Sequence, residues 1–201
     1  MAVVSYRALA ARVLTLPARL GPVRLVGVDG PTGSGKSTFA GRLADALRSA
    51  GSDVTLLHTD DLLDGWADTV TFWPRLESWV LAPLRDGKPG GYRPYDWYAG
   101  AFGADWTQVP ATGVLILDGV TSTRRAAAPD LTLAVWMSMQ PSRSLARAID
   151  RDGEAMAGEL TAWHDREQAH FAIDDTPARA DLLVDGDPRL PHDPAAEFVT
   201  G

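Results

Sequence analysis

The stretch GPTGSGKST at residues 30–38 constrains the fold more than any other part of the chain. It matches the phosphate-loop pattern G-x-x-x-x-G-K-[ST], in which glycines let backbone N–H groups converge on phosphate oxygens. An apolar run, Val23–Val28, precedes the loop, and apolar residues at helical spacing follow it as far as Gly51. The pattern requires this order of strand, loop and helix, so we predict that the chain binds a nucleotide.

Individual roles follow from the pattern. Lys36 reaches the β- and γ-phosphates, the Ser37 hydroxyl ligates Mg²⁺, and the N-terminus of the following helix adds a partial positive charge. The expected cofactors are therefore ATP and Mg²⁺. We expect the nucleotide to be held by the whole loop, namely Gly30, Pro31, Thr32, Gly33, Ser34, Gly35, Lys36, Ser37 and Thr38.

Five apolar runs separated by helical patterns define the fold class. Strands that alternate with helices indicate βαβ units and a mainly parallel sheet covered on both faces. We predict an α/β P-loop NTPase fold with three α/β/α layers, a five-stranded mainly parallel sheet and a helical lid, in one domain spanning 1–201. The five runs are Val23–Val28, Val54–His58, Val114–Asp118, Leu131–Met137 and Asp181–Asp185.

Two regions depart from this alternation. Asp61–Pro110 holds five of the seven tryptophans with scattered glycine and proline, and it is expected to form functional loops around one helix, Pro74–Leu84. Ser142–Phe171 is helical and charged but is broken at DGEAMAG. We interpret it as a lid of two helices, at about 142–171, joined by a hinge.

Composition limits the partners. The net charge of −7 argues against a general nucleic-acid binder, which needs a positive surface. The chain has no cysteine, no apolar run long enough to span a membrane and no recognisable signal peptide, so a cytoplasmic location is the default expectation. The oligomeric state is left open.

Carboxylates follow two of the predicted strands. Ligands bind outside the carboxyl ends of strands in open α/β sheets, so Asp60 and Asp61 lie near the γ-phosphate. One of them can orient an acceptor hydroxyl and take its proton, and we favour Asp60. Asp118, which ends the strand VLILD, is expected to support Mg²⁺. The alternative is a helix N-cap or a solvated turn for Asp60 and Asp61, and a strand-end turn for Asp118.

Three arginines spaced by four residues, Arg143, Arg147 and Arg151, share one helix face. Such a face can close over a triphosphate and neutralise charge during transfer, and we assign this role to Arg147 and Arg151. The alternative is a solvated face paired with Asp150 and Asp152. GTPases and ABC-type ATPases are not indicated, because their Asn-Lys-x-Asp and Leu-Ser-Gly-Gly motifs are absent.

Six elements, taken in order, resemble the uridine kinase-like branch of P-loop kinases, which includes phosphoribulokinase and bacterial pantothenate kinase. The elements are VGVDGPTGSGKST, TDDLL, GYRPYDW, LILDG, RSLARAIDRD and ADLLVDG, and they extend over about residues 20–186. The resemblance implies an ATP-dependent kinase acting on a hydroxyl of a small molecule such as a nucleoside, a sugar or a pantothenate-like compound. It further implies that Asp60 is the catalytic base and that Arg93, Tyr95 and Asp96 line the acceptor pocket.

The chain departs from that branch at several positions. Leu62 and Leu63 replace the usual aromatic pair, Ala148 replaces an arginine of the lid, and Gly100 lies where a uracil-binding histidine is usual. These departures argue against uridine itself as the acceptor.

Other interpretations remain open. A kinase for nucleoside monophosphates or shikimate would bind an anionic acceptor through arginines, and a nucleotide-sensing protein would bind ATP without an acceptor. The tryptophans either form a stacking wall or belong to the core. His164 and His170 are expected on the helix surface or in the lid rather than at a metal. The arginines available to an anionic acceptor are Arg75, Arg85, Arg93, Arg124 and Arg125, and the five tryptophans are Trp66, Trp73, Trp79, Trp97 and Trp106.

Overall fold

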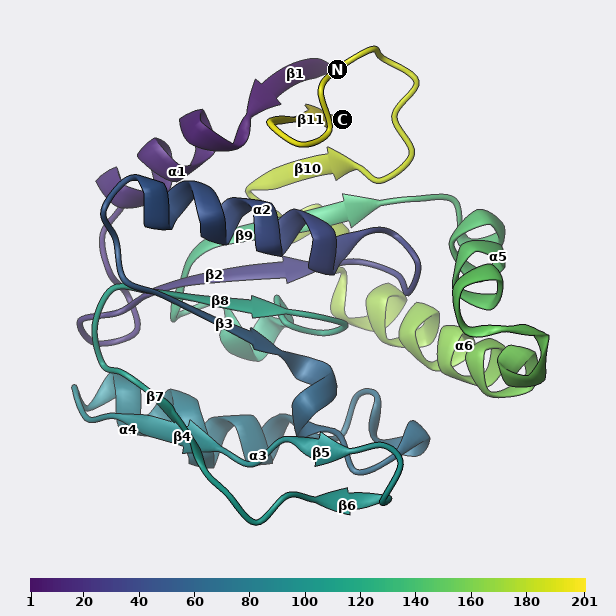
Figure 1. Cartoon of the computed structure of the whole chain (residues 1–201), viewed down its shortest axis with the longest axis horizontal. Coiled ribbons are helices and arrows are strands. Elements are labelled where there is room, and N and C mark those ends of the chain that lie inside the picture. Colours follow the sequence, from purple (N-terminus) through teal and green to yellow (C-terminus); the bar gives the residue numbers. More distant parts are fainter.

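The computed structural model describes residues 1–201 as three layers, with helices on both faces of one sheet (Figure 1). Five strands run parallel in the order β10-β9-β2-β8-β3. They coincide with the five predicted apolar runs, so the predicted α/β class is confirmed. Their bounds are β2 (Arg24–Asp29), β3 (Val54–His58), β8 (Val114–Asp118), β9 (Leu131–Ser138) and β10 (Leu182–Asp185).

The sheet has seven strands rather than the predicted five. At the β10 edge, β11 (Glu197–Thr200) pairs antiparallel with β10, and β1 (Ala2–Ser5) pairs antiparallel with β11. These two strands bring the N- and C-terminal ends of the chain together beyond β10, at one edge of the sheet (Figure 1).

The two faces of the sheet are covered by different helices. One core joins alternate strand residues such as Val26 to α1 (Tyr6–Thr15) and α2 (Lys36–Ser49). The predicted apolar face of α2, Phe39, Leu43 and Leu47, is buried in it. The other core joins the intervening residues, such as Leu25, to α6 (Ala157–Asp174) and to the helix that begins at Trp73.

The segment between β3 and β8 is more regular than the predicted loops. The helix expected at 74–84 runs from α3 (Trp73–Leu76) through a π-helical turn (Glu77–Leu81) to α4 (Ala82–Arg85). Two small antiparallel sheets follow, one within the other. They are formed by β4 (Gly90–Tyr92) with β7 (Thr107–Val109), and by β5 (Tyr95–Asp96) with β6 (Ala101–Phe102).

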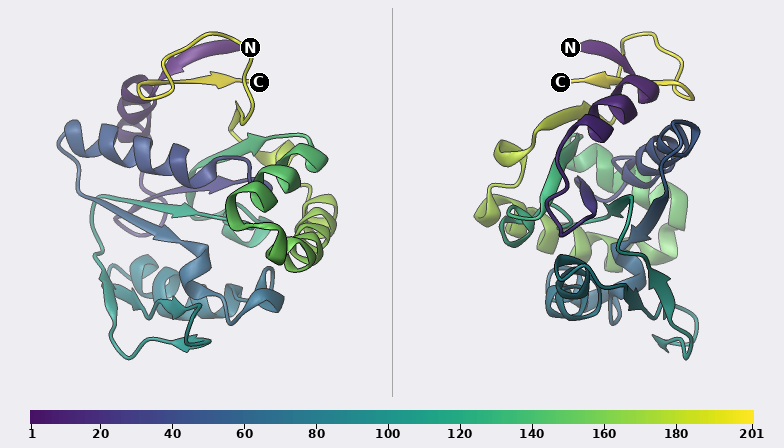
Figure 2. Two further views of the ribbon diagram at one scale, coloured as in Figure 1. Left: turned by 45° about the vertical axis from the view of Figure 1, so that its right-hand side comes forward. Right: turned by 90° about the vertical axis from the view of Figure 1, so that its left-hand side faces the viewer.

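The expected pair of lid helices lies at the carboxyl end of the sheet (Figure 2). It consists of α5 (Pro141–Asp152) and α6 (Ala157–Asp174), with Gly153 at a φ of 94° between them. None of the helices combines the length and apolar character needed to cross a bilayer. Short 3₁₀ turns occur at Thr59–Leu62, Trp66–Asp68, Arg125–Ala127, Glu154–Met156 and Pro177–Arg179.

Candidate active site

The phosphate loop presents unpaired amides at the start of α2. Five amides have no hydrogen-bond partner within the chain, whereas the amide of Ser34 donates to Pro31 and that of Phe39 to Gly35. Unpaired N–H groups at a helix N-terminus form an anion site, as the sequence pattern requires. The five free amides belong to Gly33, Gly35, Lys36, Ser37 and Thr38.

Lys36 lies at the bottom of this cradle. Its side chain is largely buried, and Nζ donates a hydrogen bond to the Pro31 carbonyl oxygen at 3.0 Å. A phosphate placed on the loop amides would meet this ammonium group. A cleft of about 400 Å³, here called the phosphate cleft, adjoins it; among the residues lining this cleft are Gly33, Lys36, Ser37, Asp60, Asp61 and Asp118.

Asp118 is buried at the end of β8, where the strand register sets it opposite His58 of β3. His58 Nδ1 lies 2.7 Å from Asp118 Oδ2, and this hydrogen bond raises the pKa of His58, against the opposite effect of partial burial. Asp118 Oδ1 has no partner. A free carboxylate oxygen in the same cleft as the Ser37 hydroxyl fits the oxygen ligands that Mg²⁺ prefers.

Asp60 and Asp61 both line the phosphate cleft, but their surroundings differ. Asp60 is exposed to solvent in the cleft, but the protein atoms around its carboxylate still raise its pKa through desolvation, although Lys36 opposes this effect. Partial burial also raises the pKa of Asp61, which lies beside the Tyr92 hydroxyl. Asp60 alone of the two also faces a second cleft, described below.

Two of the three lid arginines reach the phosphate loop. Arg147 and Arg151 line a hollow of about 240 Å³ together with Lys36, Ser37 and Thr38. Arg147 donates to the carbonyl oxygen of Gly186 at 3.0 Å, and Arg151 pairs with Asp152 at 2.6 Å. Arg143 points away and pairs with Asp187 at 2.8 Å.

The second cleft, here called the aromatic cleft, has a volume of about 410 Å³. Trp66 packs edge-to-face on Trp97 and on Trp163, at centroid distances of 5.3 and 5.8 Å. Two of the five tryptophans considered for a stacking wall therefore line a cleft, and α6 supplies a third. Its lining includes Thr32, Asp60, Trp66, Trp97, Leu160 and Trp163.

The three residues expected in the acceptor pocket do not line either cleft. Arg93 lies over the rings of Trp79 and Trp106, at 5.8 and 5.5 Å. Asp96 accepts hydrogen bonds from the amides of two residues in the turn between β5 and β6. Tyr95 packs edge-to-face on Trp97, which is itself a residue of the cleft wall. The acceptor role that the resemblance implied for these three residues therefore stays a prediction, which their positions outside both clefts do not support.

Departures from the kinase pattern also have structural reasons. Leu62 and Leu63 are fully buried in the core beneath the 3₁₀ turn after β3. Ala148 is buried against the phosphate loop, and a Cβ on Gly33 would lie 3.2 Å from the Ala148 nitrogen and 2.1 Å from the Ser144 carbonyl oxygen. A large residue in place of Ala148 would therefore separate α5 from the loop.

The sequence analysis did not identify one buried carboxylate that binds the first residue of the phosphate loop. Asp29, the last residue of β2, is fully buried and accepts four hydrogen bonds from Gly30, Thr121 and Thr123. Burial raises the pKa of Asp29 to about 6, although these hydrogen bonds stabilise its charged form. The sequence did contain a signal for this role, because Asp29 ends a predicted strand and directly precedes the first glycine of the loop.

A second missed carboxylate comes from the lid. Glu167 of α6 is fully buried and binds Thr32 of the phosphate loop and His164 of its own helix. His164 thus lies in a lid helix, one of the two positions that the sequence suggested, but it is buried there rather than on the helix surface. No sequence signal linked Glu167 to a loop 135 residues away.

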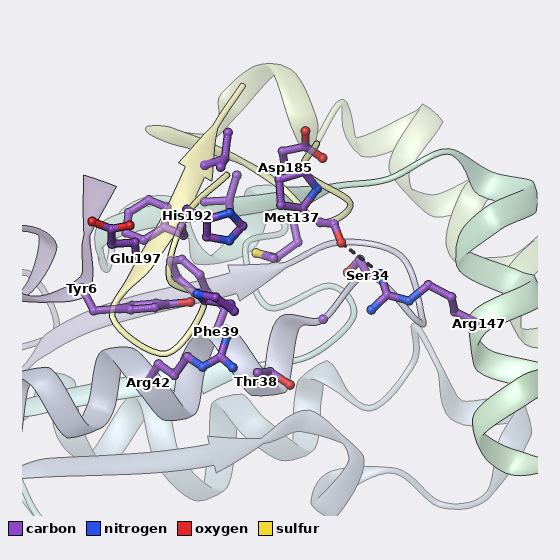
Figure 3. A pocket seen from close by; sticks show the side chains of 17 residues that line it. Tyr6, Ser34, Thr38, Phe39, Arg42, Met137, Arg147, Asp185, His192 and Glu197 are labelled. Atoms are coloured by element: carbon purple, nitrogen blue, oxygen red, sulfur yellow. Dashed lines mark hydrogen bonds between the residues drawn. The ribbon is translucent and has the colours of Figure 1, made fainter. Parts of the chain in front are cut away.

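A third hollow of about 310 Å³, here called the terminal pocket, continues from the phosphate loop toward the chain ends (Figure 3). Tyr6 and Phe39 pack 5.3 Å apart on one side, and Arg147 faces the loop from the other. The segment after β10, with Gly186, Pro188 and His192, completes it.

The fold can be compared with known proteins. No family model and no curated protein matches the sequence. A solved structure described as a possible uridine kinase from Bacillus stearothermophilus matches with a TM-score of 0.67 and 17% identity, over 89% of this chain and 96% of the other. A proposed fructose transport system kinase from Silicibacter sp. TM1040 matches at 0.60 and 20%, over 83% and 95%. The chain therefore has the fold of the uridine kinase-like P-loop kinases, as its motifs predicted.

Proposed function

We propose that this protein is a kinase that transfers the γ-phosphoryl group of ATP to a hydroxyl group of an uncharged small molecule. The observation that carries the proposal is the position of Asp60, which lines both the phosphate cleft and the aromatic cleft. A carboxylate between a donor and an acceptor can orient the hydroxyl and take its proton. The kinase descriptions of the two matching structures support transfer over binding alone.

The phosphate-donating nucleotide would occupy adjoining parts of the site. The free loop amides, Lys36 and the two lid arginines would hold the triphosphate, and the terminal pocket would hold the nucleoside. Ser37 and the free oxygen of Asp118 would hold Mg²⁺, which neutralises phosphate charge when bound. Arg147, which lines both the terminal pocket and the phosphate hollow, would connect the two parts of the nucleotide site.

The charge of the aromatic cleft favours an uncharged acceptor. Its walls are mainly aromatic, and its charged residues are Asp60, Asp152 and Arg151. Arg151 pairs with Asp152 and also lines the phosphate hollow, so no free cation remains for an anionic acceptor. Indole faces suit the flat apolar face of a nucleoside or a sugar.

The same observation weighs against the kinases of nucleoside monophosphates or shikimate. The arginines that would bind such an anion are engaged elsewhere. Arg85 pairs with Asp130 at 2.7 Å, Arg75 with Asp68 at 2.8 Å, and Arg125 binds Asp174. Arg124 lies over Trp73, and Arg93 over Trp79.

An ADP-release assay with a panel of acceptors tests the proposal. We expect an uncharged nucleoside, sugar or polyol to stimulate ADP release, because it fits the aromatic walls. Pantothenate, shikimate and nucleoside monophosphates should fail, because they bring a negative charge to Asp60. Stimulation by an anion alone would overturn the acceptor class, and silence across the whole panel would favour a nucleotide sensor.

A matched pair of tryptophan variants controls this assay. Trp97 and Trp106 are both partly exposed, but only Trp97 lines the aromatic cleft. Trp97→Ala should raise KM for the acceptor and leave KM for ATP unchanged, whereas Trp106→Ala should change neither. Equal effects of the two substitutions would place the acceptor elsewhere.

Nucleotide binding is expected to order α5 rather than the whole lid. Only Ser144 and Ala148 of α5 are buried, whereas five residues of α6 are buried and Phe171 packs 4.7 Å from Trp136. Weakly buried elements open most easily. A non-hydrolysable ATP analogue should slow hydrogen exchange across residues 141–156 and leave 161–174 almost unchanged. Equal protection of both segments would show that the lid moves as one unit.

A further inference from the structure

Glu167 makes an unusual contact for a fully buried carboxylate. The Thr32 amide donates to both of its oxygens at 3.0 Å, and the Thr32 hydroxyl donates to Oε2 at 3.0 Å. His164 Nδ1 lies 3.0 Å from Oε1. Burying a carboxylate is costly unless donors surround it, and here most of the donors come from the phosphate loop.

Thr32 occupies a sensitive point of that loop. It lines both the phosphate cleft and the aromatic cleft, so a shift of Thr32 would change the boundary between them. Its amide is paired with Glu167, whereas the amides of Gly33 and of Gly35–Thr38 have no partner in the chain. Glu167 therefore fixes the loop without occupying those five phosphate-binding amides.

The helix that carries Glu167 also forms a wall of the aromatic cleft. Leu160 and Trp163 line that cleft, and they precede Glu167 by seven and four residues, which places all three on one face of α6. One helix face thus contacts the phosphate loop at one point and the aromatic cleft at two others. The distance between loop and wall depends on the contact between Glu167 and Thr32.

We infer that Glu167 is a positioning residue for phosphoryl transfer, a role that rests on the function proposed above. It holds the phosphate loop at a fixed distance from the acceptor wall, so that the γ-phosphoryl group faces the acceptor hydroxyl. Reacting atoms must be aligned within a fraction of an ångström, and a displacement of about 1 Å can cost roughly 10²-fold in rate. Glu167 touches no reacting atom and acts through Thr32.

Two substitutions at Glu167 test this role. Glu167→Gln keeps one oxygen that can accept from the Thr32 amide, whereas Glu167→Leu removes both. We expect kcat to fall about 10-fold in the glutamine variant and about 10²-fold in the leucine variant. ATP affinity, measured by calorimetry, should change less than about threefold in both, because the phosphate-binding amides remain. Glu159→Gln, an exposed change on the same helix, should match the wild type.

A role in stability alone predicts a different result. In that case the melting temperature would fall, but kcat of the folded enzyme would stay within about twofold of the wild type, which would overturn the inference. If the leucine variant does not fold, kcat of the glutamine variant tests the inference, and a value within about twofold of the wild type would again overturn it. Combining Thr32→Ala with Glu167→Leu should cost little more than Glu167→Leu alone, because the two residues act as one unit.

A readout without turnover separates this inference from the proposed function. Hydrogen exchange of residues 30–38 should be faster in Glu167→Gln than in the wild type, because glutamine keeps only one of the two oxygens that accept from Thr32. If no compound in the acceptor panel is phosphorylated, the proposed function fails, yet this measurement still shows whether Glu167 holds the loop. Unchanged exchange in that segment would overturn the holding role itself.

Discussion

Replacing Lys36 by alanine is expected to reduce kcat/KM for ATP by roughly 10³-fold, with the folded structure retained. Lys36 brings the one buried cation to the phosphate cleft, whereas Arg147 and Arg151 approach from the exposed lid. A buried ammonium group stabilises phosphate charge more than a solvated one, because water screens it less. Steady-state kinetics with the acceptor found in the panel, together with calorimetry of ATP binding, measures the loss.

The chain offers one matched control, because Lys88 is its only other lysine. Lys88 is exposed, and its ammonium group lies 3.8 Å from Asp86. Lys88→Ala should leave both turnover and ATP affinity at wild-type values. If Lys36→Ala and Lys88→Ala turn over at the same rate, the phosphate loop does not bind the nucleotide as proposed.

The central part of the fold was predictable because its signals are local. Buried parallel strands are apolar on both faces, so β2, β8 and β9 appear in the sequence as continuous apolar runs. Strands β1 and β11 have only four residues each and lie at the edge, where neither is apolar along its length. Their pairing joins the two ends of the chain, and a pattern of neighbouring residues in the sequence does not predict a contact between such distant segments.

The same distinction between local and long-range signals applies to the candidate site. The phosphate loop is contiguous, so one motif located residues 30–37, and the strand ends placed Asp60 and Asp118 at the same edge. Glu167 and Trp163 reach the site only through packing of α6 on the sheet. Their spacing along α6 shows a buried face but does not say which loop that face meets.

Arg93 and Asp96 lie outside the two clefts, so their position differs from the one that the resemblance implied. The motif implied a role for each residue, but the roles depend on how the segment after α4 folds. Here Asp96 caps the turn between β5 and β6, and Arg93 lies over two tryptophans. The neighbouring Trp97 lines the cleft instead, so the segment reaches the site through a different side chain.

The second large effect is expected at Asp60. Asp60→Asn keeps the size of the side chain but cannot take a proton, so kcat should fall by about 10²- to 10⁴-fold. ATP affinity should stay nearly constant, because Asp60 faces the acceptor side. A base works in its charged form, so wild-type activity should decline as pH falls through the raised pKa of Asp60. That decline should begin at a higher pH than for an ordinary aspartate and should be absent from the residual activity of the asparagine variant.

Asp61→Asn is the matched control, because it makes the same chemical change one residue later. Asp61 lies beside the Tyr92 hydroxyl and does not line the aromatic cleft, so kcat should fall far less. If Asp61→Asn is inactive while Asp60→Asn is active, the base is Asp61 and the aromatic cleft is not where the acceptor binds. Full activity of both variants with the true acceptor would mean that neither carboxylate takes the proton. Because the two side chains share the phosphate cleft and differ in the aromatic cleft, their comparison isolates the acceptor side of the reaction.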